Sequence, residues 1–309
     1  SKKIPDNWDG TVFIVTVGTP LDTNGRTSLE MVKKVCHSVA GHLKEGDCVI
    51  MRSTLKLGTT RKIVNPILSQ SGKSYDLAYC PERTLEGKAL SELERLPQIV
   101  GGMTTTATVR ASQLFQYLTP TVVRVSDADT GEMIKLIDNA SRDVQFAYAN
   151  EVAKACDAVG ISAIEVIEAG KLGYPRTSLP LPGLVGGPCL EKDPHILAEG
   201  LRELGMEPEI TMAARRVNEQ QPIEVISYLR KVMDQNYNLS KKPIISILGI
   251  AFKGQPPTSD LRGTMALPML NELRIKFPTA IFKGFDAVVS QEEIKHFGLE
   301  PVATLAEAF

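Results

Sequence analysis

The segment Thr11-Val-Phe-Ile-Val-Thr-Val17, followed by Gly18-Thr-Pro20, indicates the class of fold. A continuous apolar run that ends in a turn predicts a strand buried on both faces, as in parallel sheets. Ser28 is then expected to cap a helix, and a further helix is expected over about 105–118. Similar strand patterns occupy 47–53, 75–80, 98–102 and 121–125. Strands that alternate with helices predict βαβ units and a parallel sheet, so the fold class is α/β.

The pattern changes after residue 127. Residues 128–159 contain no proline, and an apolar stripe at helical spacing predicts one long helix. Lys135 and Asn139 lie four residues apart on one face of it, and Arg142 lies on the adjoining turn. A strand at 244–252 and a later helix and strand predict a second α/β unit. We therefore expect three regions, which are 1–126, a helical 127–236, and 237–309.

Composition excludes several classes of function. The chain has 309 residues, of which 43% are hydrophobic and 23% charged, and its net charge is -1. Neither nucleic acid nor an anionic membrane is an expected partner of such a chain. Five scattered cysteines without a C-x-x-C pair are typical of reduced thiols in a cytoplasmic protein. The four histidines show no metal-ligand spacing, so no metal site is expected.

One loop concentrates reactive side chains, Pro182-Gly-Leu-Val-Gly-Gly-Pro-Cys-Leu-Glu-Lys-Asp193. Its glycines allow sharp turns and a close approach to a ligand. A lysine near a thiol favours the thiolate, so Cys189 with Lys192 and Asp193 is typical of an activated nucleophile. The alternative is a Gly-Pro turn that precedes a helix and carries an inert, buried cysteine. The residues of the loop leave both interpretations open.

The motifs, taken in order, resemble those of the UDP-glucose/GDP-mannose dehydrogenase family. They are Val17-Gly-Thr-Pro20, Ser53-Thr54 with Gly58-Thr-Thr60, Pro81-Glu-Arg83 with Glu86, Gln98-Ile-Val-Gly-Gly102, Glu132 to Asn139, Arg142-Asp-Val144, Asn150-Glu151, Pro182 to Asp193, Leu248 to Lys253, and Asp260-Leu-Arg262. Arg142-Asp-Val144 and Tyr174-Pro-Arg176 are similar to the UDP-N-acetylmannosamine dehydrogenase branch.

The resemblance implies an enzyme that oxidises the C6 hydroxyl of a nucleotide sugar to a carboxylate with two NAD. It implies Cys189 as the nucleophile that forms a thiohemiacetal and then a thioester. Lys135 and Asn139 would donate to the oxyanion, and Lys135 would also serve as a base with a water held by Asp193 and Thr54. Glu82 would activate water for thioester hydrolysis.

The resemblance also implies binding roles. Cofactor contacts are expected from Thr19, Pro20, Thr54, Glu86 and Lys192. UDP-sugar contacts are expected from Glu82, Arg83, Lys135, Asn139, Arg142, Arg176, Gly183, Gly186, Lys253 and Arg262, with Arg176 reaching the site of a partner subunit. The long helix is expected to form a homodimer. Regions 1–126 and 237–309 would then be parts of Rossmann-like NAD and UDP-sugar domains.

The sequence departs from the family in one respect. It contains no G-x-G-x-x-G loop, which holds the cofactor pyrophosphate at a helix N-terminus. We expect the first βαβ unit to be lacking, the C-terminal domain to be shortened, and strong NAD binding to be lost. A module that only binds nucleotide sugar or dimerises is therefore an alternative, as is a different UDP-sugar such as UDP-glucose. A third alternative, a 6-phosphogluconate-like or 3-hydroxyacid dehydrogenase, has a similar domain order. It ranks below the others because such an enzyme has no use for Cys189 as a nucleophile.

Overall fold

The computed structural model describes residues 4–5, 9–236 and 242–309. The chain divides into two compact units. The first comprises Ser1–Ala140 with Lys192–Pro208, and the second comprises Ser141–Glu191 with Glu209–Phe309. The division into three regions drawn from the sequence remains a prediction.

A five-stranded sheet forms the centre of the first unit, with its strands in sequence order. They are β1 (Val12–Val15), β2 (Asp47–Met51), β3 (Tyr75–Tyr79), β4 (Gln98–Gly102) and β5 (Val122–Arg124). β1, β2 and β3 are parallel, as predicted, and β4 is parallel to β5. The expectation of a fully parallel sheet was wrong, because β3 and β4 pair antiparallel. The segment between them carries only the short helix α3 (Ala89–Arg95), and an antiparallel pair needs no crossover helix.

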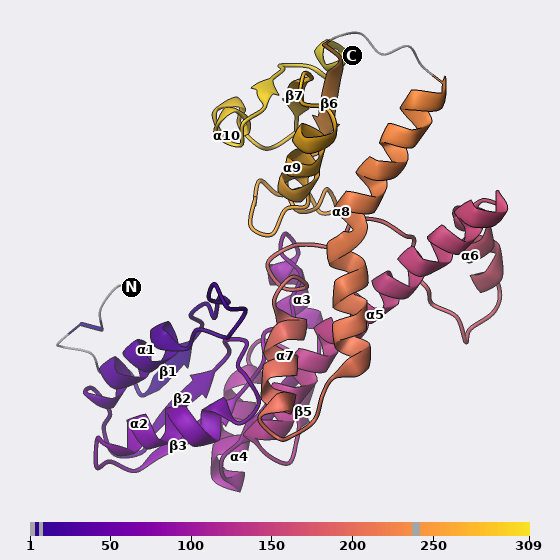
Figure 1. Cartoon of the computed structure of the whole chain (residues 1–309). Coiled ribbons are helices and arrows are strands. Elements are labelled where there is room, and N and C mark those ends of the chain that lie inside the picture. The colour runs from indigo at the N-terminus through magenta and orange to yellow at the C-terminus, as the bar shows by residue number, and fades with distance from the viewer. Residues whose placement is uncertain (1–3, 6–8, 237–241) are drawn as a thin grey trace. The chain divides into compact units, whose positions relative to one another are not determined.

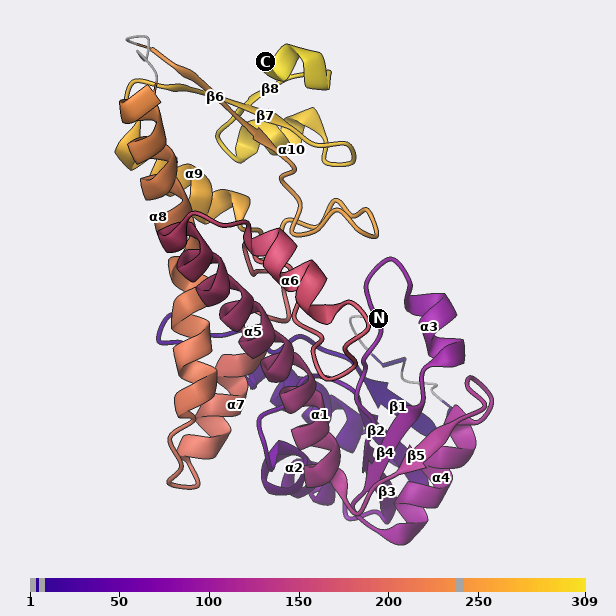
Figure 2. The same ribbon diagram turned by 90° about the vertical axis from the view of Figure 1, so that its right-hand side faces the viewer.

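Helices cover both faces of this sheet (Figure 2). On one face lie α1 (Glu30–Ala40), η1 (Thr60–Val64) and α2 (Asn65–Ser69), whose apolar side chains pack on β1, β2 and β3. On the other face lies α4 (Thr105–Phe115), where Phe115 packs against Ile50 and Val100. The predicted cap at Ser28 was wrong, because α1 begins one residue after Leu29 and no side chain caps it.

β1 lies at one edge of the sheet as described. The prediction that it is buried on both faces was wrong, since Ile14 is 49% exposed while Phe13 and Val15 are buried. Alternation of this kind arises where only one face of a strand is covered. The carboxyl ends of β1, β2 and β3 lie at the same edge of the sheet because these strands are parallel.

The long helix α5 runs from Ala128 to Val159, as predicted, and α6 covers Ala163–Lys171. α7 (Asp193–Arg202) belongs to the first unit and α8 (Glu209–Asn236) to the second. No helix among the described residues is both long enough and apolar enough to cross a lipid bilayer.

The second unit contains a parallel sheet of β6 (Ile244–Leu248), β7 (Ile281–Phe285) and β8 (Glu300–Pro301). α9 (Ala266–Lys276) packs against α8 through Leu273 and Ile226 (Figure 1). The short helices α10 (Gln291–His296) and η2 (Leu305–Ala308) complete it. β6 ends earlier than the predicted 244–252 because Gly249, with φ of 86°, turns the chain.

Candidate active site

The loops that follow β1 and β2 meet at the carboxyl edge of the first sheet. Thr19 donates its hydroxyl to the backbone oxygen of Thr54 over 2.6 Å, so two predicted cofactor residues lie together. Ser53 is buried, and its Oγ has no hydrogen-bond partner among the described residues. Ligands of open α/β sheets bind at this edge, so a buried hydroxyl without a partner here is consistent with a ligand site.

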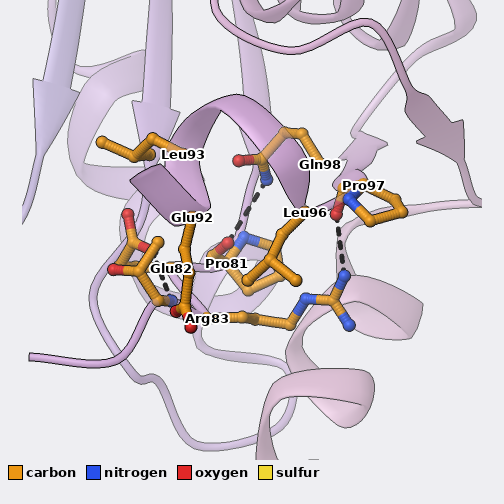
Figure 3. A pocket seen from close by; sticks show the side chains of 9 residues that line it. Pro81, Glu82, Arg83, Glu92, Leu93, Leu96, Pro97 and Gln98 are labelled. Carbon is orange, nitrogen blue, oxygen red and sulfur yellow. Dashed lines mark hydrogen bonds between the residues drawn. The ribbon is translucent and has the colours of Figure 1, made fainter. Parts of the chain in front are cut away.

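The loop after β3 places Glu82 beside a buried arginine. Arg52, at the end of β2, forms an ion pair with Glu82, and its Nη1 donates to Gln98 over 2.9 Å. Gln98 in turn donates to the backbone oxygen of Pro81 over 3.2 Å (Figure 3). Burial acts to raise the pKa of Glu82, but the hydrogen bonds from Arg52 and the backbone of Thr84 outweigh it and hold the pKa below the ordinary value. Glu82 is therefore a carboxylate at neutral pH, as a general base must be.

Arg83 links this loop to α5. Its guanidinium donates to the backbone oxygen of Pro97 over 2.7 Å, which Figure 3 shows at one side of the pocket, and forms an ion pair with Asp138 at 3.3 Å. Glu86 and Pro20 are exposed. The structure thus places Glu82 and Arg83 in one pocket of the first unit.

A second group of predicted residues meets where α7 begins beside α5. Asn139 donates its amide to Oδ2 of Asp193 over 2.6 Å, and Lys192 donates to Oδ1 over 2.7 Å. Asp193 is fully buried, so two donors satisfy a carboxylate that would otherwise be costly to bury. Lys135, half-buried, lies one turn before Asn139 on α5. The predicted common face of Lys135 and Asn139 is confirmed by the continuous helix.

Glu132, one turn before Lys135, is a residue to which the sequence assigned no role. Its buried carboxylate accepts the backbone N–H of Gly58 at 2.6 Å and the N–H and hydroxyl of Thr60 at 2.7 and 2.6 Å. Burial raises the pKa of Glu132 to about 7, although these hydrogen bonds act to lower it. Glu132 therefore anchors to α5 the segment that carries Thr54. The only signal for this role was an acidic residue in the second turn of the predicted helix.

Cys189 lies in the second unit and is exposed, whereas Cys36, Cys48, Cys80 and Cys156 are buried. The alternative that Cys189 is a buried cysteine was therefore wrong, and the reactivity of its thiol stays a prediction. The loop before it packs closely on the segment after β6. The N–H of Gly187 donates to the backbone oxygen of Gly263 over 2.7 Å, and a Cβ on Gly187 would lie 2.7 Å from the ring of Phe252.

The predicted cations of the second unit have different surroundings. Arg262 is exposed and paired with Asp260, to whose Oδ2 its Nε donates over 2.9 Å. Hydrogen bonding by Arg262, with some attraction from Lys253, lowers the pKa of Asp260. Arg176 donates to the hydroxyl of Tyr174 over 3.0 Å and stacks over its ring. Arg142 is exposed on α5.

The predicted site residues are thus divided between the two units. The first unit holds Thr19, Pro20, Thr54, Glu82, Arg83, Glu86, Lys135, Asn139, Lys192 and Asp193. The second holds Arg142, Arg176, Gly183, Gly186, Cys189, Lys253 and Arg262. No group of histidine, cysteine and acidic residues within the described ranges could hold a metal ion. The sequence did not point to Arg52, whose only signal was a charge at the end of an apolar strand.

Two domain models of one family match this chain. The NAD binding domain of the UDP-glucose/GDP-mannose dehydrogenase family matches residues 4–119, and the central domain of that family matches residues 129–220. A UDP-N-acetyl-D-glucosamine 6-dehydrogenase from Pseudomonas aeruginosa is 32% identical over 95% of this chain and 70% of its own length. The chain belongs to the UDP-glucose/GDP-mannose dehydrogenase family.

Other relatives match the chain at similar sequence identity. An NDP-N-acetyl-D-galactosaminuronic acid dehydrogenase from Ralstonia nicotianae is 32% identical, with 84% of this chain and 62% of the relative covered. The solved structure of a UDP-D-ManNAc dehydrogenase from Pyrococcus horikoshii aligns with a TM-score of 0.82 at 31% identity, covering 91% of this chain and 66% of that one. The chain spans 62–65% of the length of the first curated relatives that it matches.

Proposed function

We propose that the protein is a cytoplasmic, NAD-dependent dehydrogenase that oxidises the C6 hydroxyl of a UDP-sugar to a carboxylate. The observation that carries the proposal is the exposure of Cys189. It is the one exposed thiol among five cysteines that all lie within the described residues, and it lies three residues before the pair of Lys192 and Asp193. A four-electron oxidation needs an accessible nucleophile to hold the aldehyde.

We propose NAD as the cofactor, bound at the carboxyl edge of the first sheet. Thr19, Thr54 and the buried hydroxyl of Ser53 lie there, and the match to an NAD binding domain covers this region. The hydroxyl of Ser53, which has no partner among the described residues, can bond to a polar cofactor, and Pro20, Glu86 and Lys192 are proposed as further contacts. When bound, NAD accepts a hydride in each of the two oxidations. Weak NAD binding in the absence of a glycine-rich loop remains a prediction, which isothermal titration tests.

In the first oxidation Lys135 takes the proton of the C6 hydroxyl as the carbon loses a hydride. The carboxylate of Asp193 orients Asn139 through the 2.6 Å hydrogen bond, so an amide N–H and Lys135 are available to the oxygen of the reacting carbon. With Thr54, Asp193 also holds a water for proton transfer.

In the second oxidation the sulfur of Cys189 adds to the aldehyde carbon, and the carbonyl oxygen takes a proton to give a thiohemiacetal. Loss of a hydride and of that proton leaves a thioester. Water then attacks the thioester carbon while Glu82 accepts a proton from it. The C–S bond breaks, and the carboxylate and the thiol of Cys189 are released.

We propose UDP-N-acetylmannosamine as the substrate. The Pyrococcus horikoshii relative of that name supports it at 31% identity over 88% of this chain. Relatives named for UDP-N-acetylglucosamine and for N-acetylgalactosaminuronic acid match at similar identity, so these sugars and UDP-glucose are the competing substrates. Arg83, Arg142, Gly183, Gly186, Lys253 and Arg262 would contact the sugar nucleotide, and Arg176 would do so from a partner subunit.

A homodimer through α5 is part of the proposal. Ile137, Tyr148 and Val159 are exposed and lie eleven residues apart, which places them on one face of the helix. Large apolar side chains aligned along one face favour contact with a second helix.

The deciding experiment measures NADH absorbance when the protein is mixed with NAD and each UDP-sugar, with Cys189→Ser alongside. At NAD concentrations high enough to offset weak binding, we expect two NADH per UDP-N-acetylmannosamine in the wild type and no complete turnover in the variant. Sugar binding without NADH would instead favour the alternative, a module that binds nucleotide sugar or dimerises but does no chemistry. The absence of a G-x-G-x-x-G sequence is the observation that favours that alternative.

A further inference from the structure

The loop that carries Cys189 is held by side chains from two helices of the second unit. Asn150 of α5 accepts the N–H of Gly183 at 2.8 Å and donates to the backbone oxygen of the same residue over 3.0 Å. Arg215 of α8 donates to the backbone oxygen of Leu190 over 2.8 Å and, more weakly, to that of Val185 over 3.4 Å. These attachments lie on both sides of Cys189, and one of them is to the residue that directly follows it.

The side chains that hold the loop form one buried network. Arg215 forms an ion pair with Asp143 at 2.7 Å. Asn218 donates to Oδ1 and to the backbone oxygen of Asp143, each over 2.9 Å, and accepts from Asn150 at 3.0 Å. All four residues are at most 2% exposed. Hydrogen bonds among these four side chains fix the orientation of Asn150 and Arg215, which bond to the loop. The network therefore favours a single arrangement of the loop backbone.

Arg215 acts on the loop through the directions of its N–H groups and not through its charge. Nη1 donates both to Asp143 and to the backbone oxygen of Leu190, and Nη2 donates to that of Val185. Nε lies 3.2 Å from the carboxylate of Glu219, so two acids balance the charge of the guanidinium. The guanidinium has five N–H groups in a fixed plane, so one side chain can serve an ion pair and two carbonyls at set angles. A lysine at this position would keep the charge and lose that geometry.

We propose that Arg215 is a positioning residue for the Cys189 nucleophile, which it sets through the backbone of Leu190 and Val185. The proposal rests on the proposed function, in which the thiol of Cys189 attacks the aldehyde. Arg215 fixes the position of the loop backbone. Asp143 and Asn218 in turn hold its guanidinium in place, and Asn150 holds the loop at Gly183.

The test uses Arg215→Lys in the full chain, with Arg216→Lys as the matched control. Arg216 is the next residue on α8 and is exposed. Ellman's reagent is bulky, and in the wild type it should react rapidly with one thiol, because the other four are buried. We expect one rapidly reacting thiol in Arg215→Lys as well, with a rate constant at least threefold higher because the loop is released. We expect kcat to fall about tenfold, with KM for the sugar nucleotide unchanged.

A higher reactivity of one thiol, with the other four still protected, distinguishes positioning of the loop from a general loosening of the fold. Simultaneous reaction of all five thiols would show general loosening and overturn the proposal, as would wild-type thiol reactivity and kcat in a folded Arg215→Lys. An equal effect of Arg216→Lys would also overturn it. The thiol reaction needs neither NAD nor sugar, so it tests the positioning even if the chain proves to have no dehydrogenase activity.

If Arg215→Lys does not fold, Asn150→Asp provides the second test. The aspartate keeps an acceptor for the N–H of Gly183 and loses the donors to Gly183 and Asn218. We expect a smaller increase in the reactivity of one thiol, about twofold. Wild-type reactivity in this variant would overturn the proposal.

Discussion

Among the individual residues, Arg52 acts directly on Glu82, a proposed catalytic group. It is 7% exposed and lies against Glu82, Gln98 and the ring of Phe115. The burial of Glu82 opposes ionisation, and the hydrogen bonds and charge of Arg52, together with the hydrogen bonds from Thr84, outweigh that effect. Glu82 is therefore available as a base over a wider range of pH than an ordinary glutamate.

Arg52→Gln should remove this effect. Without the hydrogen bond and the charge of Arg52 the pKa of Glu82 rises, so the acid limb of carboxylate formation moves to higher pH. The measurement is the pH dependence of product release from the enzyme, with the exposed Arg95→Gln as control. An acid limb that stays in place in Arg52→Gln would show that Glu82 is not the base for hydrolysis.

Glu132 provides a second prediction for a single residue, on stability. Its pKa is about 7 in the folded state, above its ordinary value of 4.5, so the folded state binds the proton more tightly. The contribution of Glu132 to stability is therefore present below pH 4.5 and is lost as the pH rises to about 7. The loss is roughly 3 kcal/mol.

Glu132→Gln should flatten this dependence, because the amide does not titrate. Urea unfolding at pH 5 and pH 7 measures the difference in the free energy of unfolding. The wild type should lose more stability than Glu132→Gln between the two values. Equal slopes in the two proteins would contradict the shifted pKa.

At the scale of elements, two loops of the second unit fit together through glycines. Gly187 and Gly263 both have positive φ, 92° and 63°, which side chains rarely adopt. A Cβ on Gly263 would lie 2.4 Å from Oε2 of Glu191 and 2.8 Å from the backbone carbon of Gly187. The contact joins the segment after β6 to the loop of Cys189.

Gly263→Ala should therefore destabilise the second unit by about 1 to 3 kcal/mol, from strain and from the close contact. Gly254→Ala is the matched control, because no atom lies within 4 Å of its Cβ and its φ is not in the left-handed region. Thermal unfolding of both variants gives the comparison. If the melting temperature of Gly254→Ala falls as far as that of Gly263→Ala, the loop contact is not the cause.

At the scale of the whole molecule, the exposed face of α5 determines the expected oligomeric state. Tyr148 is 58% exposed at the middle of the row formed with Ile137 and Val159. Tyr148→Lys should shift a dimer to monomer in analytical ultracentrifugation. Asp157→Lys introduces the same side chain on the opposite face, nine residues or about 180° away, and should leave the dimer intact. A monomeric wild type would refute the proposed interface.

Much of the element order followed from the sequence, because apolar periodicity reports local burial. α5 was predicted over 128–159 as observed, and β4 at 98–102 likewise. The direction of β4 was not predictable, since antiparallel pairing with β3 depends on the path of the connecting segment. The exposure of Ile14 was not predictable either, because periodicity cannot tell which face of a strand is covered.

For the site, spacing alone placed Lys135 and Asn139 on one face of a helix, and the motifs singled out Cys189 and Asp193. The bonds that orient these residues join segments far apart in the chain, as in Asn139 with Asp193 and Arg215 with Leu190. The sequence by itself therefore determined the kinds of chemical group and their local order. Only the tertiary structure decided which of them are buried, ionised and held, because burial and hydrogen bonding depend on neighbours that folding brings together.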